Sequence, residues 1–300
     1  MDEAIRPINV QTTKQRIKSY SSNPGSLILA VLVGLAALIT FLTLVFIIGY
    51  ILVMGIPNLK PSLFQLEYNS DNVSMLPSII NTVGMTLLSL VIAGPLGILA
   101  AVYLVEYAKK GNKLVSVVRV TAETLTGIPS IVYGLFGMLF FVTALKWGYS
   151  MLAGAFTLAI MVLPVIMRTT EEALLAVPDM YREASFGLGA GRLRTIFVVI
   201  LPSAVPGILS GVILAIGRIV GETAALMYTA GTVAEMPKSV MSSTRTLSVH
   251  MYTLASEGLH IDAAYATAVV LLVVVLLINW VSGRVAKTLA IMVLPVIMRT

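Results

Sequence analysis

The sequence contains no cysteine, only two histidines and few charged side chains. The lack of cysteine excludes disulfides and thiolate metal sites, and it says nothing about the redox compartment. His250 and His260 have no third ligand near them in the sequence, so we expect them to be loop residues and expect no metal site. Charged residues make up 11% of the chain, against roughly 25% in soluble domains. This composition excludes a water-soluble fold.

Hydrophobic residues make up 58% of the chain, and the mean hydropathy is +0.95. An apolar helix of about 20 residues crosses the hydrocarbon core of a bilayer. Six segments are long enough: residues 27–56, 78–104, 124–145, 149–167, 196–228 and 263–283. We therefore predict an all-α integral membrane protein with six transmembrane helices. In the fifth segment Pro202 and Pro206 predict a bend.

The two ends of the chain differ from this central part. Residues 1–26 are polar and are not a secretory signal, because the apolar run that follows is too long for one. Residues 27–287 form the predicted transmembrane domain. Residues 157–169 recur without change as residues 288–300. Natural repeats diverge and cover a whole structural unit, so we interpret the second copy as an artefact of the sequence and do not count it as a span.

Basic residues are unevenly divided between the two sides of the predicted bundle. With six spans, one side has fourteen Lys and Arg and the other has four, namely Lys60, Lys146, Lys238 and Arg245. Cytoplasmic loops carry the excess of Lys and Arg in membrane proteins. We therefore expect both termini, including a tail of residues 1–26, to be cytoplasmic. The net charge of +6 then needs no nucleic acid to explain it.

The loop of about residues 168–195, between the fourth and fifth segments, contains a short amphipathic pattern. Pro178 and Asp179 are helix-start signals, and glycines from Gly187 onward are stop signals. One face of this predicted helix carries Met180, Ala184, Gly187 and Leu188. Such a helix fits a groove on another protein, or it lies on the lipid surface.

The same loop resembles the EAA loop of ABC importer permeases. In that family the pattern is Glu-Ala-Ala, three residues, Gly, nine residues, Ile, one residue and Leu-Pro. The matching residues here are Glu183, Ala184, Ser185, Gly189, Leu201 and Pro202, with Ser185 in place of the second Ala and Val199 in place of Ile. The resemblance implies a type I-like permease bundle whose coupling helix, with Glu183, Ala184, Ser185 and Gly189, fits a cleft on an ATPase subunit.

Three further stretches are similar to the phosphate permeases of this family, the PstA type: residues 94–107, 126–137 and 219–225. The similarity covers about residues 27–287. It implies an importer of inorganic phosphate in the inner membrane of a bacterium or archaeon. The implied partners are a similar second permease (PstC type), two copies of an ATPase (PstB type) and an external phosphate-binding protein (PstS type).

The chain has no Gly-x-x-x-x-Gly-Lys-[Ser/Thr] motif. We therefore expect that it does not hydrolyse ATP by itself, holds no cofactor, and leaves ATP and magnesium to the ATPase. Two other functions stay open: the same machinery for another oxyanion such as molybdate or sulfate, and a membrane regulatory protein that does not transport.

Arg218 and Glu222 are the charged pair of the fifth segment. They are four residues apart, so on a continuous helix they share one face. Charges inside a membrane are costly and mark substrate paths by default, although a static ion pair would also account for them. A guanidinium suits an oxyanion, so we predict Arg218 in the substrate path, with Glu222 holding it when no substrate is present. The pairs Gly207/Gly211 and Gly217/Gly221 predict close helix packing.

Overall fold

The computed structural model describes residues 24–109 and 111–297, and side chains up to residue 288. This part of the chain is built of helices and contains no strand. It divides into two compact units, one up to Val53 and one from Met54 onward, which are described separately. Most of the predicted tail and residues 298–300 lie outside the described residues.

The described part of the first unit is one helix, α2 (Pro24–Gly55), whose last two residues belong to the second unit. It has no charged residue and is apolar on all faces, as expected of a helix surrounded by lipid. The hydroxyls of Thr40 and Thr43 donate to carbonyls one turn earlier, at 2.9 and 2.8 Å. These bonds satisfy hydroxyl groups that hydrocarbon cannot.

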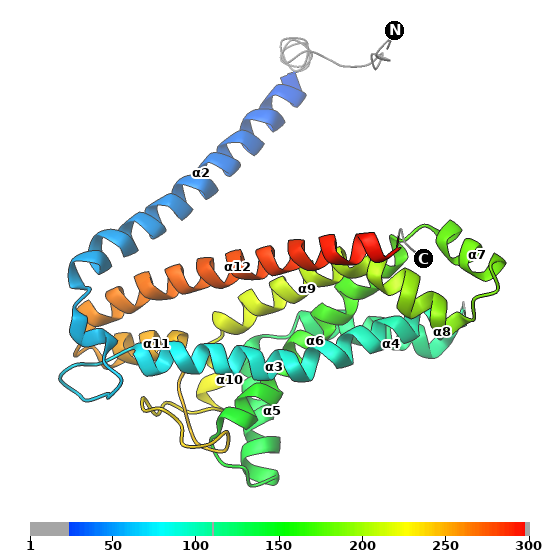
Figure 1. Cartoon of the computed structure of the whole chain (residues 1–300). Helices are drawn as coiled ribbons and strands as arrows, with labels where there is room; N and C mark the ends of the chain where they lie inside the picture. Colours follow the sequence, from blue (N-terminus) through cyan, green and yellow to red (C-terminus); the bar gives the residue numbers. More distant parts are fainter. Residues whose placement is uncertain (1–23, 110, 298–300) are drawn as a thin grey trace. The chain divides into compact units, whose positions relative to one another are not determined.

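In the second unit, four long helical stretches lie side by side (Figure 1). They are α3 (Leu76–Val102) with the π-helical η3 (Tyr103–Tyr107), α6 (Met151–Leu175), α8 (Arg192–Arg194) with the π-helical η5 (Thr195–Ile200) and α9 (Leu201–Val220), and α12 (Ile261–Ile297). Each is long and apolar enough to cross a membrane, as is α2. These helices and the broken pair described below agree with an all-α membrane protein of six spans.

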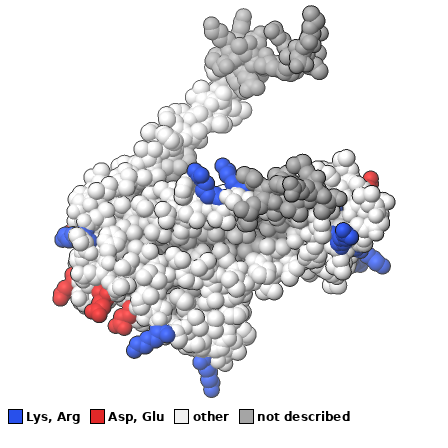
Figure 2. Space-filling view, in the orientation of Figure 1, with Lys and Arg blue, Asp and Glu red and all other residues white. Residues whose placement is uncertain are grey.

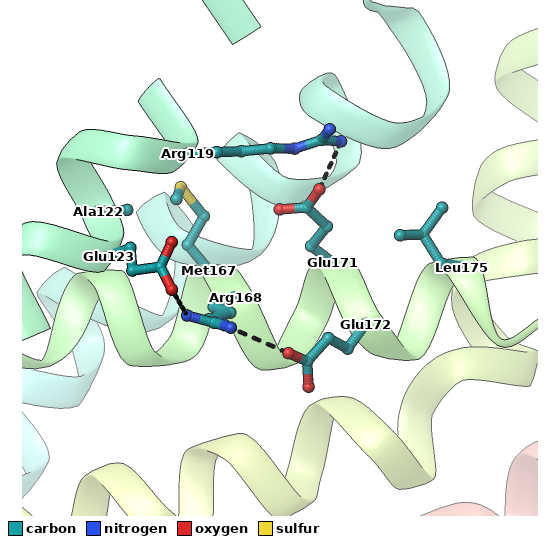
Figure 3. Close-up of a pocket in the computed structure, with 8 residues that line it drawn as sticks. All are labelled: Arg119, Ala122, Glu123, Met167, Arg168, Glu171, Glu172 and Leu175. Atoms are coloured by element: carbon teal, nitrogen blue, oxygen red, sulfur yellow. Dashed lines mark hydrogen bonds and ion pairs between the residues drawn. The ribbon is translucent and has the colours of Figure 1, made fainter. Parts of the chain in front are cut away.

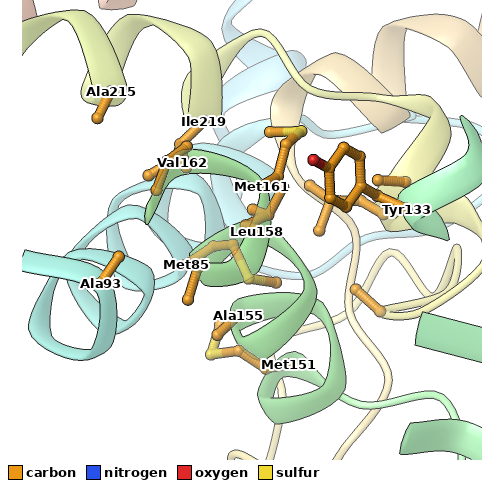
Figure 4. Packing of buried hydrophobic residues seen from close by; sticks show 14 of the residues in the cluster. Met85, Ala93, Tyr133, Met151, Ala155, Leu158, Met161, Val162, Ala215 and Ile219 are labelled. Carbon is orange, nitrogen blue, oxygen red and sulfur yellow. The ribbon is translucent and has the colours of Figure 1, made fainter. Parts of the chain in front are cut away.

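The core of the second unit is centred on α6, which packs against α3 and α9. Its buried face alternates small residues with Leu158, Met161 and Val162, and Met85 of α3 packs against them (Figure 4). Small residues allow helix backbones to approach closely where the solvent is lipid and dispersion contacts replace the hydrophobic effect. α6 is thus the central helix of the second unit, and the charged residues described below lie on or next to the helices packed around it.

The remaining elements are short. They are η1 (Ile56–Asn58), η2 (Pro61–Phe64), α4 (Lys113–Thr126), α5 (Ser130–Gly137), the π-helical η4 (Met138–Ala144), α7 (Asp179–Gly187), α10 (Ala224–Met227) and α11 (Leu247–Glu257). In Figure 1, α7 and α8 lie at one end of the second unit and α11 at the other. The following text calls these the α7 end and the α11 end.

The predicted third span is wrong as a straight helix over residues 124–145. α4 and the α5–η4 stretch meet at a bend of 103°. Gly127 caps α4, and Pro129 both lacks an amide hydrogen and keeps Ile128 out of the helical region. The Tyr133 hydroxyl donates to the Leu125 carbonyl across the bend at 2.7 Å. The third span is therefore a broken pair of helices, and the sequence analysis missed the amphipathic α4.

The predicted fifth span, residues 196–228, is also wrong at its end. The helix stops at Val220, and α10 is a separate turn after Gly221, whose amide donates to the Gly217 carbonyl at 3.3 Å. The chain stays helical through Pro202 and Pro206, with the wider η5 directly before Pro202. A π-helical turn leaves room for a proline ring that would otherwise meet the carbonyl of the preceding turn.

Three smaller expectations change as well. α6 extends to Leu175, so the loop predicted from residue 168 begins about two turns later. His250 is not a loop residue, because it lies in α11 with no exposed surface. Residues 288–297 of the duplicated stretch continue α12 as a helix.

Charged side chains are sparse on the surface of the molecule. Figure 2 shows a broad white area, with most of the visible acidic side chains at the α11 end and Lys or Arg side chains at several places, two of them midway along the second unit. A surface that is mostly uncharged is the one that a bilayer requires. It agrees with the membrane-spanning helices.

Candidate functional site

The helix predicted in the loop exists as α7, which begins after Pro178 and carries Asp179 in its first turn. An acidic residue there stabilises the helix, because its negative charge lies near the positive end of the helix dipole. The four residues of its predicted apolar face are all exposed, and Leu188, just past the helix, is 88% exposed. Tyr181 and Phe186 are also exposed. The face is unpartnered within the described residues of this chain, as a docking surface has to be.

A buried ion pair fixes α7 to the bundle. Arg182 donates to the Glu106 carboxylate at 2.7 Å, and the two side chains are 16% and 9% exposed. Two other donors of Arg182 reach the carbonyls of Leu174 and Val177, at the end of α6 and just after it, both at 3.0 Å. Removing one partner of such a pair leaves a buried charge and costs about 3–5 kcal/mol.

Glu106 also binds an arginine in the segment that follows α7. Arg192 donates to the Glu106 carbonyl, and its guanidinium lies over the Tyr107 ring at 5.0 Å. η3, at the end of the α3 stretch, therefore holds both sides of the loop. Sequence reasoning gave Glu106 and Arg182 no role, although a glutamate at the end of an apolar helix is itself a signal of a buried partner.

The predicted coupling residues divide into exposed and buried members. Glu183 and Ala184 are exposed, and Ser185 is buried, where its hydroxyl lies 2.8 Å from that of Thr195. Gly189 is exposed and has a φ of +82°, a left-handed conformation that favours glycine. The chain reverses there, which directs Arg192 back to Glu106. The roles of these residues in coupling stay predictions.

A second charged group lies between α4 and α6 (Figure 3). Arg119 pairs with Glu171 at 2.5 Å, and Arg168 bridges Glu123 and Glu172, both at 3.3 Å. The five side chains line an open pocket of about 280 Å³. All except Glu171 are exposed, so each of the two pairs of Arg168 contributes no more than about 1 kcal/mol. The network holds the helix before the bend against the central helix.

Arg218 lies in the last turn of α9 and is half-buried. With Val165, Leu214 and Asn279 it lines an open pocket of about 590 Å³. No hydrogen bond or ion pair joins it to another described residue. A guanidinium that lines a pocket with free donors can receive an anion.

The expected pairing of Arg218 with Glu222 is wrong. Because α9 ends at Val220, Glu222 lies in the break, and its carboxylate accepts from the Ala225 amide at 3.0 Å. Its carbonyl accepts from the hydroxyl of Ser248 in α11 at 2.6 Å. The buried Glu222 thus ties the start of α10 to α11 and leaves Arg218 without a counter-ion among the described residues.

The four predicted packing glycines have different surroundings. A Cβ on Gly207 would lie 2.6 Å from that of Ala173, and one on Gly211 would lie 1.9 Å from the Thr169 hydroxyl. These two glycines let α9 approach α6. A Cβ on Gly217 would meet nothing within 4 Å, and one on Gly221 only the Gly217 carbonyl at 3.6 Å.

A family model, the binding-protein-dependent transport system inner membrane component, matches residues 93–290. The chain belongs to this family of ABC transporter permeases, and it is an integral protein of the inner membrane. The matched part runs from α3 to α12 and so contains the bent pair, α7 with its anchor, and Arg218.

Curated relatives narrow the comparison. The chain is 34% identical to the probable ABC transporter permease protein YqgI of Bacillus subtilis, with 85% of this chain and 94% of the relative covered. It is 36% identical to the phosphate transport system permease protein PstA of Pasteurella multocida, with 79% and 85% covered. It is 35% identical to PstA 2 of Mycobacterium tuberculosis, with 69% and 72% covered.

Solved structures share the fold. A permease chain of a bacterial alginate ABC transporter, in complex with an alginate-bound periplasmic protein, gives a TM-score of 0.66 at 17% identity, with 90% of this chain and 98% of that chain covered. The MetNI methionine transporter, in an inward-facing conformation, gives 0.55 at 22% identity, with 72% and 94% covered. The type I-like permease bundle expected from the sequence is therefore confirmed as a fold.

Proposed function

We propose that this chain is a permease subunit of an ATP-driven importer of inorganic phosphate. The observation that carries the proposal is α7, a short helix that a buried ion pair fixes to the bundle and whose apolar face is exposed. The chain is also 33–36% identical to PstA permeases, with 77–85% of their length covered. Such a helix serves a transporter whose energy comes from another subunit.

The mechanism follows from how α7 is held. A partner ATPase, which binds ATP and magnesium, closes around the exposed face of α7. Because Arg182 and Arg192 connect α7 to Glu106, a displacement of α7 moves the end of the α3 stretch with it. The bundle then alternates between openings toward the two sides of the membrane. This chain supplies positioning and a path, and no covalent step falls to it.

The partners we propose are a similar second permease, two copies of the ATPase and an external phosphate-binding protein, of the PstC, PstB and PstS types. A second permease would cover the exposed apolar surfaces of the spanning helices that face the pathway. The proposed orientation places the α7 end and both termini in the cytoplasm, which follows from the distribution of Lys and Arg in the sequence.

Arg218 is the residue we propose for the substrate path. It lies in a membrane-spanning helix, lines a pocket and has no acidic partner among the described residues. An unpaired cation at membrane depth is costly unless an anion visits it. Glu222 takes a structural part in this proposal, since its carboxylate holds the break after α9.

Uptake of radiolabelled phosphate into cells that express the complete importer tests the function. We expect saturable uptake that unlabelled phosphate suppresses and that an excess of sulfate or molybdate leaves largely unchanged. Suppression by sulfate or molybdate at concentrations similar to phosphate would assign the machinery to another oxyanion. An absence of uptake, together with no ATPase bound to the purified chain, would support the regulatory alternative.

A further inference from the structure

Arg245 lies between α10 and α11 and is only 4% exposed. The sequence suggested an ordinary loop charge, so this burial is a correction. Its guanidinium lies over the Tyr68 ring at 4.8 Å, and its carbonyl accepts from Asn81 of α3 at 3.4 Å. The segment around it is therefore folded against the start of α3 and is not a solvated loop.

The guanidinium of Arg245 has free donors. Its Nε and Nη2 atoms are buried and have no hydrogen-bond partner among the described residues, and no carboxylate there forms an ion pair with it. Stacking on an aromatic ring contributes roughly 0.5–2 kcal/mol and does not use the edge donors. A buried cation costs several kcal/mol unless it is paired. The structure thus holds a charge whose partner is not part of the described chain.

Other unpaired polar groups lie at the same junction. Of the five described residues with buried, unpaired side-chain polar atoms, four are Ser78, Thr244, Arg245 and His250. The His250 ring meets the Tyr68 ring edge-on at 6.2 Å, with Tyr68 in turn under Arg245. Ser78 is one turn before Thr82, whose hydroxyl accepts from the Leu247 amide at 2.8 Å.

The chemistry of this group favours an anion. It offers a guanidinium, two hydroxyls and an imidazole, which all can donate, and it contains no carboxylate. Burial and the charge of Arg245 lower the pKa of His250 to about 3, against a smaller opposing effect of the Val73 backbone. The ring is therefore neutral at physiological pH, and one of its nitrogens can donate a hydrogen bond. Paired N–H groups of a guanidinium match two oxygens of a tetrahedral oxyanion.

We propose that Arg245, with Ser78, Thr244 and His250, forms a second binding site for an inorganic oxyanion of the size of phosphate at the α11 end. In the proposed orientation this end is external, so the site lies on the entry side and uses residues other than Arg218 of α9. The identity of the anion rests on the proposed phosphate transport, but the existence of the site does not. A lipid headgroup is a poor fit, because its phosphodiester carries two substituents and Arg245 is almost fully enclosed.

The test uses the full chain, expressed with its permease and ATPase partners but without the binding protein, in detergent freed of phospholipid. A fluorescent tag on this chain reports its thermal stability by size exclusion after heating. We expect inorganic phosphate to raise the Tm above that in chloride at equal ionic strength, because a ligand that binds only the folded state stabilises it. In Arg245→Gln the concentration needed should rise about tenfold or more.

Matched variants separate this site from the transport path. Lys238→Gln removes a positive charge from an exposed position of the same segment and should keep the full phosphate shift. Arg218→Gln should lose uptake and keep the part of the shift that depends on Arg245, which is the difference in shift between Arg218→Gln and the double variant Arg218→Gln, Arg245→Gln. A failure of phosphate transport and a failure of this site therefore give different results. If Arg245→Gln does not fold, Arg245→Lys replaces it and should show a smaller shift than the wild type.

Two results would overturn the site. One is the absence of a phosphate shift in the wild-type chain, which would mean that water alone satisfies these groups. The other is an equal shift in the wild type and in Arg245→Gln or Arg245→Lys. Glycerophosphocholine, which carries the phosphodiester of a headgroup, should leave the Tm unchanged, and a shift equal to that of phosphate would assign the site to lipid.

Discussion

At the scale of single residues, burial decides what a charge contributes. Glu106 and Arg182 are 76 positions apart in the sequence and meet in a pair shielded from water, whereas the pairs of Arg168 are exposed. The same two chemical groups therefore have different energetic consequences. The buried pair contributes to holding α7, and the exposed pairs contribute little.

The buried pair gives the first prediction. Arg182→Gln alone should lower the free energy of unfolding by about 3–5 kcal/mol, because it leaves the Glu106 carboxylate buried without its partner. Glu106→Gln should cost less, because Arg182 keeps its ion pair with the exposed Asp179 at 3.1 Å. The double variant should recover part of that loss. Thermal unfolding of the purified chain measures it, with Arg168→Gln as a control that should change stability by at most about 1 kcal/mol. A double variant as unstable as the sum of the two single variants would show that the residues are not coupled.

The second prediction concerns Arg218. Arg218→Gln should abolish phosphate uptake while the chain stays in the membrane, and Arg218→Lys should retain intermediate activity because it keeps the charge and loses the planar fork. Since no described carboxylate pairs with Arg218, neither change should lower the Tm. The double variant Arg218→Gln, Glu222→Gln should remain inactive. Recovery of uptake in it, normalised to inserted protein by immunoblot, would exclude the substrate path.

At the scale of elements, hydropathy predicted most spans and missed the breaks. Lipid leaves helices as the main way to satisfy the backbone of an apolar segment, so α2, α3, α6 and α12 could be located from composition. The Gly127-Ile128-Pro129 sequence was visible, but a window of apolar residues averages over it. The burial of Arg245 could not be predicted, because it depends on contacts with Tyr68 and Asn81, far away in the sequence.

α7 carries the third prediction. Ala184→Arg or Gly189→Asp should prevent co-purification of the ATPase and abolish uptake, because both sites are exposed and a bulky charge blocks a close contact. Gly189→Asp adds the strain of a side chain at φ +82°. Thr232→Arg, an exposed position in the segment between α10 and α11, adds the same charge as Ala184→Arg and should leave both measurements unchanged. ATPase bound to Ala184→Arg and Gly189→Asp as to the wild type would remove the docking role from α7.

At the scale of the whole molecule, the orientation is open to a direct test. A reporter that is active only outside the cytoplasm should work when fused after Leu259, at the end of α11, and stay silent when fused after Gly189. Lys and Arg are concentrated in the segments on the same predicted side as α7, and cytoplasmic loops carry the excess of Lys and Arg in membrane proteins. The reverse pattern of reporter activity would put α7 outside, where no ATPase could reach it.

The double hold of Glu106 on the loop has a mechanical consequence. Its carboxylate grips one arginine within α7 and its carbonyl grips another beyond the turn at Gly189, so the helix is pinned on both sides. An element pinned at two points cannot rock about either of them. A force from an ATPase would therefore not merely rotate α7. It would displace α7 and the end of the α3 stretch together. The hinge for this movement then has to lie elsewhere in the chain. The bend between α4 and α5 is the place for it, because helical hydrogen bonds are already interrupted there.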